Sequence, residues 1–203
     1  MTELLAGLLP FLAILNPFAL CLYLIHVMEE LRPGQFALVL GKASVASLAV
    51  FCVFAVAGEP LLVKVLRIRP GAMRVFGGIV FFVVAYGYVT KGYKATTLLR
   101  GRLDELPSEI AVPFMIGAGT ITQATLLGKQ HSAGFAVLVL VVGMVVSVLA
   151  VLLFNYVRMR MKGVREDLFE RYINILSRLN GLLIGALSAD MVVTGIHELW
   201  EAA

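Results

Sequence analysis

The chain has 203 residues, of which 60% are hydrophobic and only 15% are charged, and its mean hydropathy is +0.94. Soluble domains carry roughly 45 to 50% apolar and about 25% charged residues, so this composition excludes a soluble globular protein and indicates an all-α integral membrane protein. The net charge of +4 is spread over short connections that also carry acidic residues, so no nucleic-acid partner is expected.

Six apolar segments are long enough to cross a hydrocarbon core of about 30 Å. They cover residues 4–28, 36–57, 72–90, 109–127, 134–157 and 175–197. The connections are short, which predicts one transmembrane domain over residues 1–203 with a linker at about 92–108. No Lys or Arg precedes the first segment, and the segment is longer than a signal peptide, so we interpret it as a retained span.

The first apolar segment contains Asn16 and Pro17 at its middle. Proline removes one helical hydrogen bond and displaces the carbonyl of Ala13, while the Asn16 amide offers two donors and an acceptor to the gap. In lipid, such a break is tolerated where the freed backbone groups are buried in protein or face water. The pair therefore indicates a ligand site near the bilayer midplane, with a simple packing kink as the alternative.

The fourth apolar segment is interrupted in a similar way by Gly117-Ala118-Gly119. The glycines allow an unwound stretch, and Thr120, Thr122 and Gln123 follow it at the start of a second half-helix. The unpaired N–H groups and positive end of a half-helix favour a carboxylate or another anion. Close helix packing through the small residues is the alternative interpretation.

Asp190 lies in the last apolar segment, about 6 Å from its centre at 1.5 Å per residue. An Asp at the centre of a bilayer costs about 2.5 to 3.5 kcal/mol on insertion scales, so we expect its side chain to face the protein interior or water. Such residues often transfer protons, and we predict that role for Asp190. A protonated structural Asp, or one paired with Lys42, is the alternative.

The two halves of the chain resemble each other at a shift of about a hundred residues. Pro10-Phe11-Leu12 matches Pro113-Phe114-Met115, Phe36-Ala37 matches Phe135-Ala136, Leu48-Ala49-Val50 matches Leu149-Ala150-Val151, and Arg74-Val75-Phe76-Gly77 matches Arg178-Leu179-Asn180-Gly181. Because each unit has three spans, the second must enter the membrane upside down. We therefore predict two inverted three-helix repeats, at about 1–95 and 107–203, with interrupted helices 1 and 4 meeting at the midplane.

The basic residues predict how the chain is oriented. Twelve Lys and Arg lie after the first, third and fifth segments, and five lie on the opposite side. Since cytoplasmic connections carry an excess of Lys and Arg, both termini are expected outside the cytoplasm.

Sequence signatures of enzymes are missing from the chain. It contains no G-x-S-x-G, no H-E-x-x-H, no Walker A motif and no cysteine pair at metal-ligand spacing. We therefore expect no enzymatic activity, no cofactor and no metal.

Several of these motifs together resemble the MarC family of integral membrane proteins. They are Leu15-Asn16-Pro17-Phe18-Ala19, Gly58, Arg74 through Gly78, Val112-Pro113 through Thr122, Gly181, Ala186 and Gly195. The resemblance implies six helices in two inverted triplets, a location in the inner membrane, and kinship with LysE-type amino-acid exporters; some members are described as transporters of glycine and alanine. The chain departs from the family pattern at Ala19, Leu22, Ala118 and Asp190, where Gly, Pro, Pro and Gln are usual.

The predicted function is a secondary transporter of a small neutral amino acid such as alanine or glycine, with proton coupling through Asp190. Asn16 and the carbonyls freed by Pro17 would bind the ammonium group, and the half-helix at Gly117, Gly119, Thr120, Thr122 and Gln123 would bind the carboxylate. A passive channel for a small solute or ion, or a membrane assembly protein that does not transport, are the alternatives. A homo-oligomer in the lipid bilayer is compatible with all three.

Overall fold

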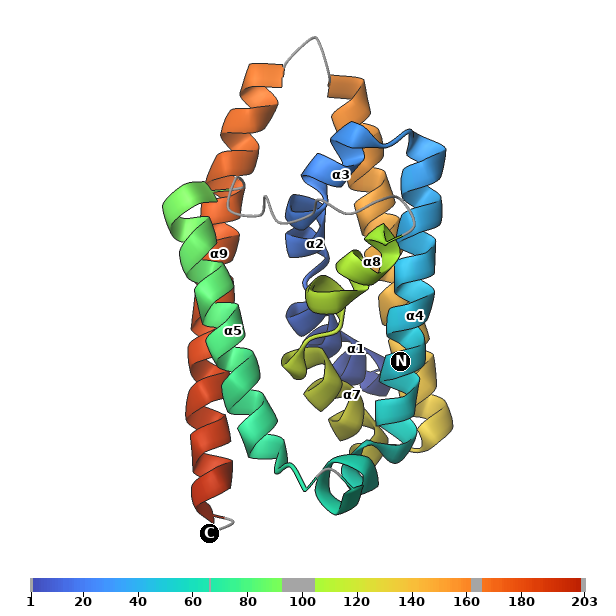
Figure 1. Cartoon of the computed structure of the whole chain (residues 1–203), viewed down its shortest axis with the longest axis vertical. Coiled ribbons are helices and arrows are strands. Elements are labelled where there is room, and N and C mark those ends of the chain that lie inside the picture. Colours follow the sequence, from blue (N-terminus) through green and yellow to red (C-terminus); the bar gives the residue numbers. More distant parts are fainter. Residues whose placement is uncertain (1, 66, 93–104, 162–165, 202–203) are drawn as a thin grey trace.

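The computed structural model describes residues 2–65, 67–92, 105–161 and 166–201, and every regular element among them is helical (Figure 1). In chain order these elements are α1 (Thr2–Leu15), α2 (Pro17–Tyr23), α3 (Ile25–Glu30), α4 (Pro33–Glu59), the π-helical turn η1 (Pro60–Val65), α5 (Pro70–Lys91), α6 (Leu106–Ile110), the π-helical turn η3 (Ala111–Met115), α7 (Ala118–Gln130), α8 (Ala133–Met161) and α9 (Glu166–Glu201). The all-α prediction is confirmed. The linker expected at 92–108 lies mostly outside the described residues.

Five segments of the described chain are long and apolar enough to cross a membrane. They are Thr2–Tyr23, which contains the break at Asn16, and Pro33–Gly58, Pro70–Lys91, Ala133–Met161 and Arg171–Glu201. The remaining expected span, 109–127, is divided among α6, η3 and α7, and α7 itself has only 13 residues. Five of the six predicted spans are therefore present as membrane-length segments. The remaining one, the fourth in chain order, is divided into short consecutive helices.

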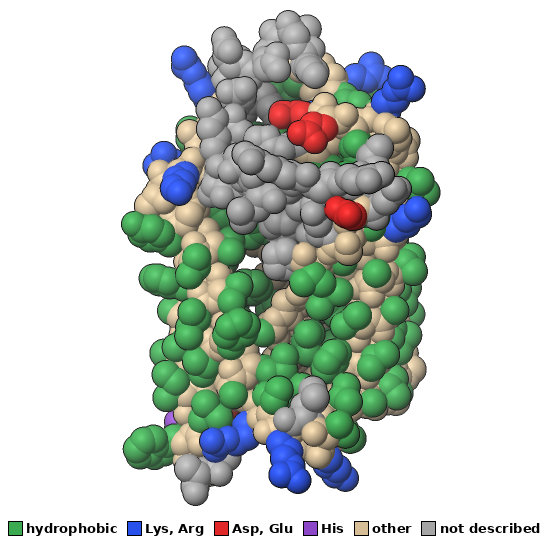
Figure 2. All heavy atoms as spheres, viewed as in Figure 1, with side chains coloured by type: hydrophobic (Ala, Val, Ile, Leu, Met, Phe, Trp, Pro, Cys, Tyr) green, Lys and Arg blue, Asp and Glu red, His purple; other side chains and the backbone are tan. Residues whose placement is uncertain are grey.

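The surface of the molecule suits a bilayer. Figure 2 shows apolar side chains over the middle of one face, with Lys and Arg gathered towards its two ends. Large apolar side chains that would be buried in a soluble protein are open here; Leu183 is 70% exposed and Phe76 is 65% exposed. An apolar belt between two charged rims is the expected outer surface of a protein whose solvent is hydrocarbon.

The long helices begin where the sequence offers a proline. Pro33 and Pro70 occupy the first turns of α4 and α5, where a missing N–H costs nothing because that N–H has no intrahelical acceptor. At the start of α4 the Arg32 N–H donates to the side-chain oxygen of Gln35 at 3.2 Å, which satisfies one more donor of the helix end.

The inner group of helices consists of α1–α2, α4, α7 and α8, and glycines set its spacing. A Cβ placed on Gly128 of α7 would collide with the backbone carbonyl of Ala55 in α4, and one on Gly143 of α8 would lie 2.5 Å from the ring of Phe11 in α1. Phe11 in turn meets Phe51 of α4 edge to face, with the ring centroids 5.6 Å apart. Small residues at these crossings let the helix backbones approach closely, as in other membrane bundles.

The helices α5 and α9 form an antiparallel pair beside this inner group (Figure 1). A Cβ on Gly71, at the start of α5, would meet the Gly195 carbonyl near the end of α9, and one on Gly78 would meet the Ser188 carbonyl. The seam between them is therefore a contact between backbones.

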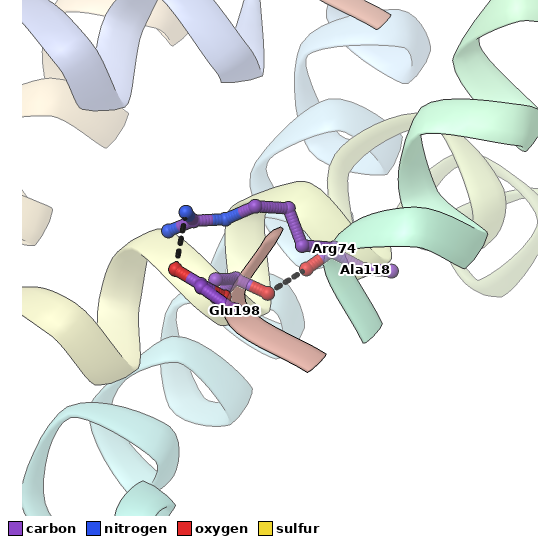
Figure 3. Close-up of polar contacts among 4 residues, drawn as sticks. Arg74, Ala118 and Glu198 are labelled. Atoms are coloured by element: carbon purple, nitrogen blue, oxygen red, sulfur yellow. Dashed lines mark hydrogen bonds and ion pairs between the residues drawn. The ribbon is translucent and has the colours of Figure 1, made fainter. Parts of the chain in front are cut away.

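A polar clasp holds each end of this pair. At one end Arg74 and Glu198 form an ion pair at 2.6 Å, drawn with the nearby Ala118 in Figure 3. Towards the other end the Arg178 guanidinium donates to the Val89 carbonyl at 3.2 Å. The two arginines are matched positions of the predicted repeat, and each links α9 to α5.

Gly128→Ala tests the contact between α7 and α4. The added methyl group would overlap the Ala55 carbonyl, so the helices must separate, and overpacking of this kind costs about 1 to 3 kcal/mol or more. We expect a clear fall in the melting temperature of the purified protein in detergent. Gly134→Ala in α8 is the matched control because nothing lies within 4 Å of its Cβ position. Equal melting temperatures for the two variants would contradict the close packing.

Candidate functional site

The first helix break is built from Asn16 and its neighbours. Asn16 adopts a left-handed backbone conformation, with φ 48° and ψ 78°, which ends α1 and starts α2 at Pro17. Asparagine tolerates this region better than most residues because its short side chain bonds locally. Its side-chain oxygen accepts the Ala19 N–H at 3.0 Å and so caps α2. Because Pro17 has no N–H, the Ala13 carbonyl loses the donor that a continuous helix would give it.

The second break lies between η3 and α7. Ile116 and Gly117 are extended, and α7 begins at Ala118. The Thr120 hydroxyl accepts the Gly117 N–H at 2.9 Å and donates towards the carbonyls of Met115 and Gly117, both at 2.9 Å. A single threonine therefore bonds to three of the backbone groups at the break, and the unwound stretch needs no proline at Ala118.

A partly enclosed cavity of about 220 Å³ lies between the two breaks. It is lined by Ala13, Ile14, Leu15, Asn16, Ala19 and Tyr23 of the first interrupted helix, by Val80, Phe81, Val83, Val84 and Gly87 of α5, by Met115, Gly117 and Thr120 of the second interrupted helix, and by Ile184 and Leu187 of α9. At about 30 Å³ per water molecule it has room for about seven. Two breaks a hundred residues apart in sequence thus face one space.

Two helix ends of opposite polarity face this cavity. Residues of the last turn of α1, at the negative end of its helix dipole, and of the first turn of α7, at the positive end of its dipole, contribute to the lining. The first intrahelical hydrogen bond of this turn runs from the Ile121 N–H to the Gly117 carbonyl, so the N–H groups before Ile121 precede the helical ladder. None of the described residues that line the cavity is charged. The site is therefore dipolar, with no net charge.

The structure separates the predicted site residues into two groups. Asn16, Gly117 and Thr120 line the cavity. The others do not: Pro17 lies beside Asn16 at the start of α2, Gly119 packs against Ile14 and Met191, the Thr122 hydroxyl donates to the Ala118 carbonyl at 2.8 Å, and Gln123 is half-buried further along α7. The two breaks lie together at the cavity, whereas Thr122 and Gln123 lie on α7 outside its lining.

Asp190 does not lie where the sequence predicted a buried carboxylate. Its side chain is exposed on α9 and lines neither the cavity nor the groove described below. The seam with α5 uses the opposite stripe of α9, which includes Ser188, Met191 and Gly195, and this packing turns Asp190 outwards. Asp190 was expected to face the protein interior or water; the structure does not place it in the interior, and its proton-coupling role stays a prediction without a cavity contact.

Asn180 of α9 is a site residue that the sequence interpretation did not select. Its side chain is only 6% exposed, and its oxygen accepts a hydrogen bond from the Asn16 amide nitrogen at 3.0 Å. The bond joins the first helix break to α9 across 164 positions of sequence. An amide inside an apolar span was the available signal, because polar groups are expensive there and usually have a partner.

A wider groove adjoins the cavity. It has a volume of about 680 Å³, runs between α1–α2 and α9, and shares Ala13, Asn16, Ile184 and Leu187 with the cavity lining. Asn180 lines the groove only. The Asn16–Asn180 hydrogen bond therefore lies at the wall between the cavity and the more open groove. We call this feature the α9 groove.

The helical spans, the apolar belt and the broken helices define a multi-pass integral membrane protein. Its sequence matches the family described as MarC family integral membrane protein over residues 1–200. The chain belongs to the MarC family, as the resemblance predicted.

Relatives of the chain occur in bacteria and archaea. A UPF0056 membrane protein of Aquifex aeolicus is 29% identical, over 94% of this chain and 91% of the relative. The UPF0056 membrane protein YvbG of Bacillus subtilis is 24% identical over 93% and 91%, and the UPF0056 inner membrane protein YhgN of Escherichia coli is 23% identical over 98% of each chain. These names give a membrane location and no substrate. No solved structure matches the chain.

Replacing Asn16 separates its two contributions to the first break. Asn16→Ala loses the cap, at about 1 kcal/mol, and also forces a left-handed backbone on a residue with a Cβ, at about 1 to 2 kcal/mol. Asn16→Gly loses the same hydrogen bonds but adopts that backbone freely. We expect Asn16→Ala to lower the melting temperature in detergent more than Asn16→Gly does. The reverse order would mean that Asn16 is not left-handed.

Proposed function

We propose that this protein is a secondary transporter of a small neutral amino acid such as alanine or glycine. The observation that carries the proposal is the uncharged cavity between the carbonyl end of α1 and the N–H end of α7. A zwitterion has no net charge but a large dipole, and it is stabilised when each of its ends meets a helix end of opposite sign. The ammonium group would lie at the Ala13 carbonyl and Asn16, and the carboxylate at the first turn of α7.

The cavity also disfavours other solutes. A cationic or anionic amino acid would leave one charge uncompensated among apolar walls, and burying an unpaired charge is far more costly than burying a matched dipole. A volume of about 220 Å³ limits the size of the side chain. The lining therefore supports a small neutral amino acid better than a charged or long one.

The packing of the helices supports the inverted-repeat part of the proposal. In a chain of two inverted units, the packing of helix 4 against the second span should have a counterpart in the packing of helix 1 against the fifth span. In agreement with this, α7 packs on α4 while α1 and α2 pack on α8. The equivalent third helices, α5 and α9, pack on each other in antiparallel orientation. We propose six spans in two units, with η3 and α7 as the broken fourth span.

Alternating access is supported by a difference between the two sides of the site. A Cβ on Gly77 of α5 would lie 2.9 Å from the Cβ of Ala118 and 3.1 Å from the Gly119 nitrogen, so α5 is seated on the second break. On the other side the α9 groove, bridged by the Asn16–Asn180 bond, separates α9 from the first break. Of the two equivalent helices, α5 is thus packed against the second break, whereas α9 is separated from the first break by a groove. Exchange of these two arrangements would expose the cavity to each face of the membrane in turn.

We also propose the orientation that the charges predict, with both termini outside the cytoplasm in the inner membrane. The ends of α8 and α9 that would then face the cytoplasm carry Arg158, Arg160, Arg171 and Arg178. Arg158 pairs with Glu29 at 3.1 Å and bonds to the Met28 carbonyl, also at 3.1 Å, so this rim is also tied to the inner helices.

Transport of radiolabelled alanine in proteoliposomes tests the function. We expect saturable uptake above that of empty vesicles, competition by unlabelled glycine, and little competition by lysine or glutamate. Uptake equal to empty vesicles would overturn the alanine assignment. Uptake that does not saturate, and that never accumulates alanine under any imposed ion gradient, would indicate a passive channel.

Gly117→Val should block the cavity without unfolding the protein. Gly117 is extended, with φ −121° and ψ 166°, a backbone that valine favours, and the nearest atom to its Cβ position is 3.9 Å away on Phe81. The added side chain would occupy space that the substrate needs, so we expect alanine uptake to fall by roughly tenfold or more. Gly34→Val is the matched control because its Cβ position is open. Normal uptake by Gly117→Val would place the substrate elsewhere.

Asp190→Asn tests proton coupling separately from binding. Asp190 is exposed and lies outside the cavity lining, so we expect alanine affinity to be unchanged in a thermal-shift titration. If Asp190 carries the coupled proton, alanine accumulation driven by an imposed pH gradient should be lost in this variant while exchange of alanine across the membrane continues. Accumulation at the wild-type level would remove Asp190 from the coupling mechanism.

A further inference from the structure

A further groove, which shares no lining residue with the cavity or the α9 groove, lies along α4. It has a volume of about 510 Å³ and is lined by Gln35, Leu38, Val39, Lys42 and Ala46 of α4 and by Pro107 and Ser108 of α6. The residues from α4 recur at intervals of three and four positions, so they form one face of that helix. Helix α6 packs against α4 and supplies the opposite wall. We call this feature the α4 groove.

Lys42 is a cation without a partner inside a membrane span. It lies nine residues after Pro33 in the apolar segment Pro33–Gly58, about 14 Å along the helix at 1.5 Å per residue. Within the part of the chain that the structure describes, no hydrogen bond or ion pair reaches its side chain, so the pairing with Asp190 considered from the sequence is not formed. A charged side chain in an apolar span is costly, and such residues are usually paired or face a site of function.

The charge of Lys42 is within reach of a molecule in the groove. The Lys42 side chain is exposed. Because Cα–Cβ bonds in a helix tilt towards its N-terminus, a lysine at this position extends back over the groove face towards Gln35, which is also exposed. The Gln35 oxygen accepts the Arg32 N–H at 3.2 Å, so its N–H₂ is the group that can bind a further acceptor. The α4 face of the groove thus offers a cation and an amide donor.

The rest of the groove does not neutralise this charge. None of its described lining residues is acidic. The Ser108 hydroxyl donates to the Glu105 carbonyl at 2.7 Å, so it adds neither a charge nor a free donor. Ala46, which is exposed, lies one turn further into the span than Lys42 and continues the groove as an apolar surface. The polar groups therefore lie towards the start of the span and the apolar end towards the middle of the bilayer, which is the order of head group and acyl chain in a phospholipid.

We propose that the α4 groove binds an anionic phospholipid, with its phosphate at Lys42 and Gln35 and an acyl chain along Ala46. An anion beside an unpaired cation at the edge of the hydrocarbon region is strongly favoured, and basic pockets between membrane helices suit acidic head groups. A zwitterionic lipid would bring its own cation next to Lys42 and so binds less tightly. A soluble phosphate ester lacks the chain that covers the apolar end. The site does not require that the protein transport amino acids.

The test compares lipids that have the same acyl chains and differ in the charge of the head group. Dioleoylphosphatidylglycerol or dioleoylphosphatidylcholine is added to the purified protein in a neutral detergent, and apparent affinities are taken from the shift in melting temperature. One lysine that meets an anionic lipid corresponds to about a fivefold difference in affinity, so we expect phosphatidylglycerol to bind about fivefold more tightly. Equal affinities for the two lipids would overturn the proposal, as would glycerol phosphate that binds as tightly as phosphatidylglycerol.

Three lysine variants locate the charge. In Lys42→Met, which keeps an unbranched side chain, the ratio of the two lipid affinities should fall to about one, whereas Lys42→Arg should keep the wild-type ratio. Lys91→Met is the matched control, because Lys91 is exposed at the end of α5 and does not line the groove. Each ratio is measured within one variant, so a change in overall stability cancels. An unchanged ratio in Lys42→Met, or an equal fall in Lys91→Met, would refute the assignment.

Ala46→Phe tests the place of the acyl chain independently. Ala46 is exposed, so the larger ring does not disturb the core, but it would fill the apolar end of the groove and weaken the binding of both lipids. Ala49→Phe is the matched control, since Ala49 is exposed on the same helix and does not line the groove. Equal lipid affinities in the two variants would contradict the proposed site. Alanine uptake by the same wild-type preparation is measured in parallel, so that failure of the lipid site and failure of the transporter proposal are seen separately.

Discussion

The fold depends on the need to satisfy every backbone polar group without water. A helix that breaks inside hydrocarbon exposes carbonyl and N–H groups, each of which costs several kcal/mol if it stays unpaired. At each break one side chain meets part of this need. The Asn16 oxygen caps the Ala19 N–H, and the Thr120 hydroxyl bonds to the Gly117 N–H and to nearby carbonyls. The cavity exists because these two side chains make an interrupted backbone stable.

How much of the site the sequence predicted depends on how far apart along the chain the interacting residues lie. The break at Asn16-Pro17 was predictable because its causes, a missing N–H and a capping amide, lie within four residues. The second break was predicted at the right place but for an incomplete reason. Gly117 is extended in a conformation open to other residues, and Thr120, three residues further on, stabilises the break. Local chemistry of this kind is visible in a sequence.

Interactions between distant helices were not visible in the same way. The link between Asn16 and Asn180 depends on how far α9 lies from the first break, and Asp190 was expected inside because its cost in lipid is known while the rotation of its helix is not. That rotation is set by glycines that place one stripe of α9 on the backbone of α5. A hydropathy pattern identifies a spanning helix, but the packing of small residues decides which of its faces points inwards.

The shortness of α7 has a consequence for how the protein is made. A segment enters the bilayer on its own when it offers about 20 apolar residues, and α7 has 13, several of them polar, while the stretch before it is already divided between α6 and η3. Its seat is formed chiefly by α4, α5 and α1, all of which are synthesised before it, with a smaller contact to α8. Insertion of this short segment then depends on helices that have already entered the bilayer, and a change that disturbs their packing removes the seat of α7 as well.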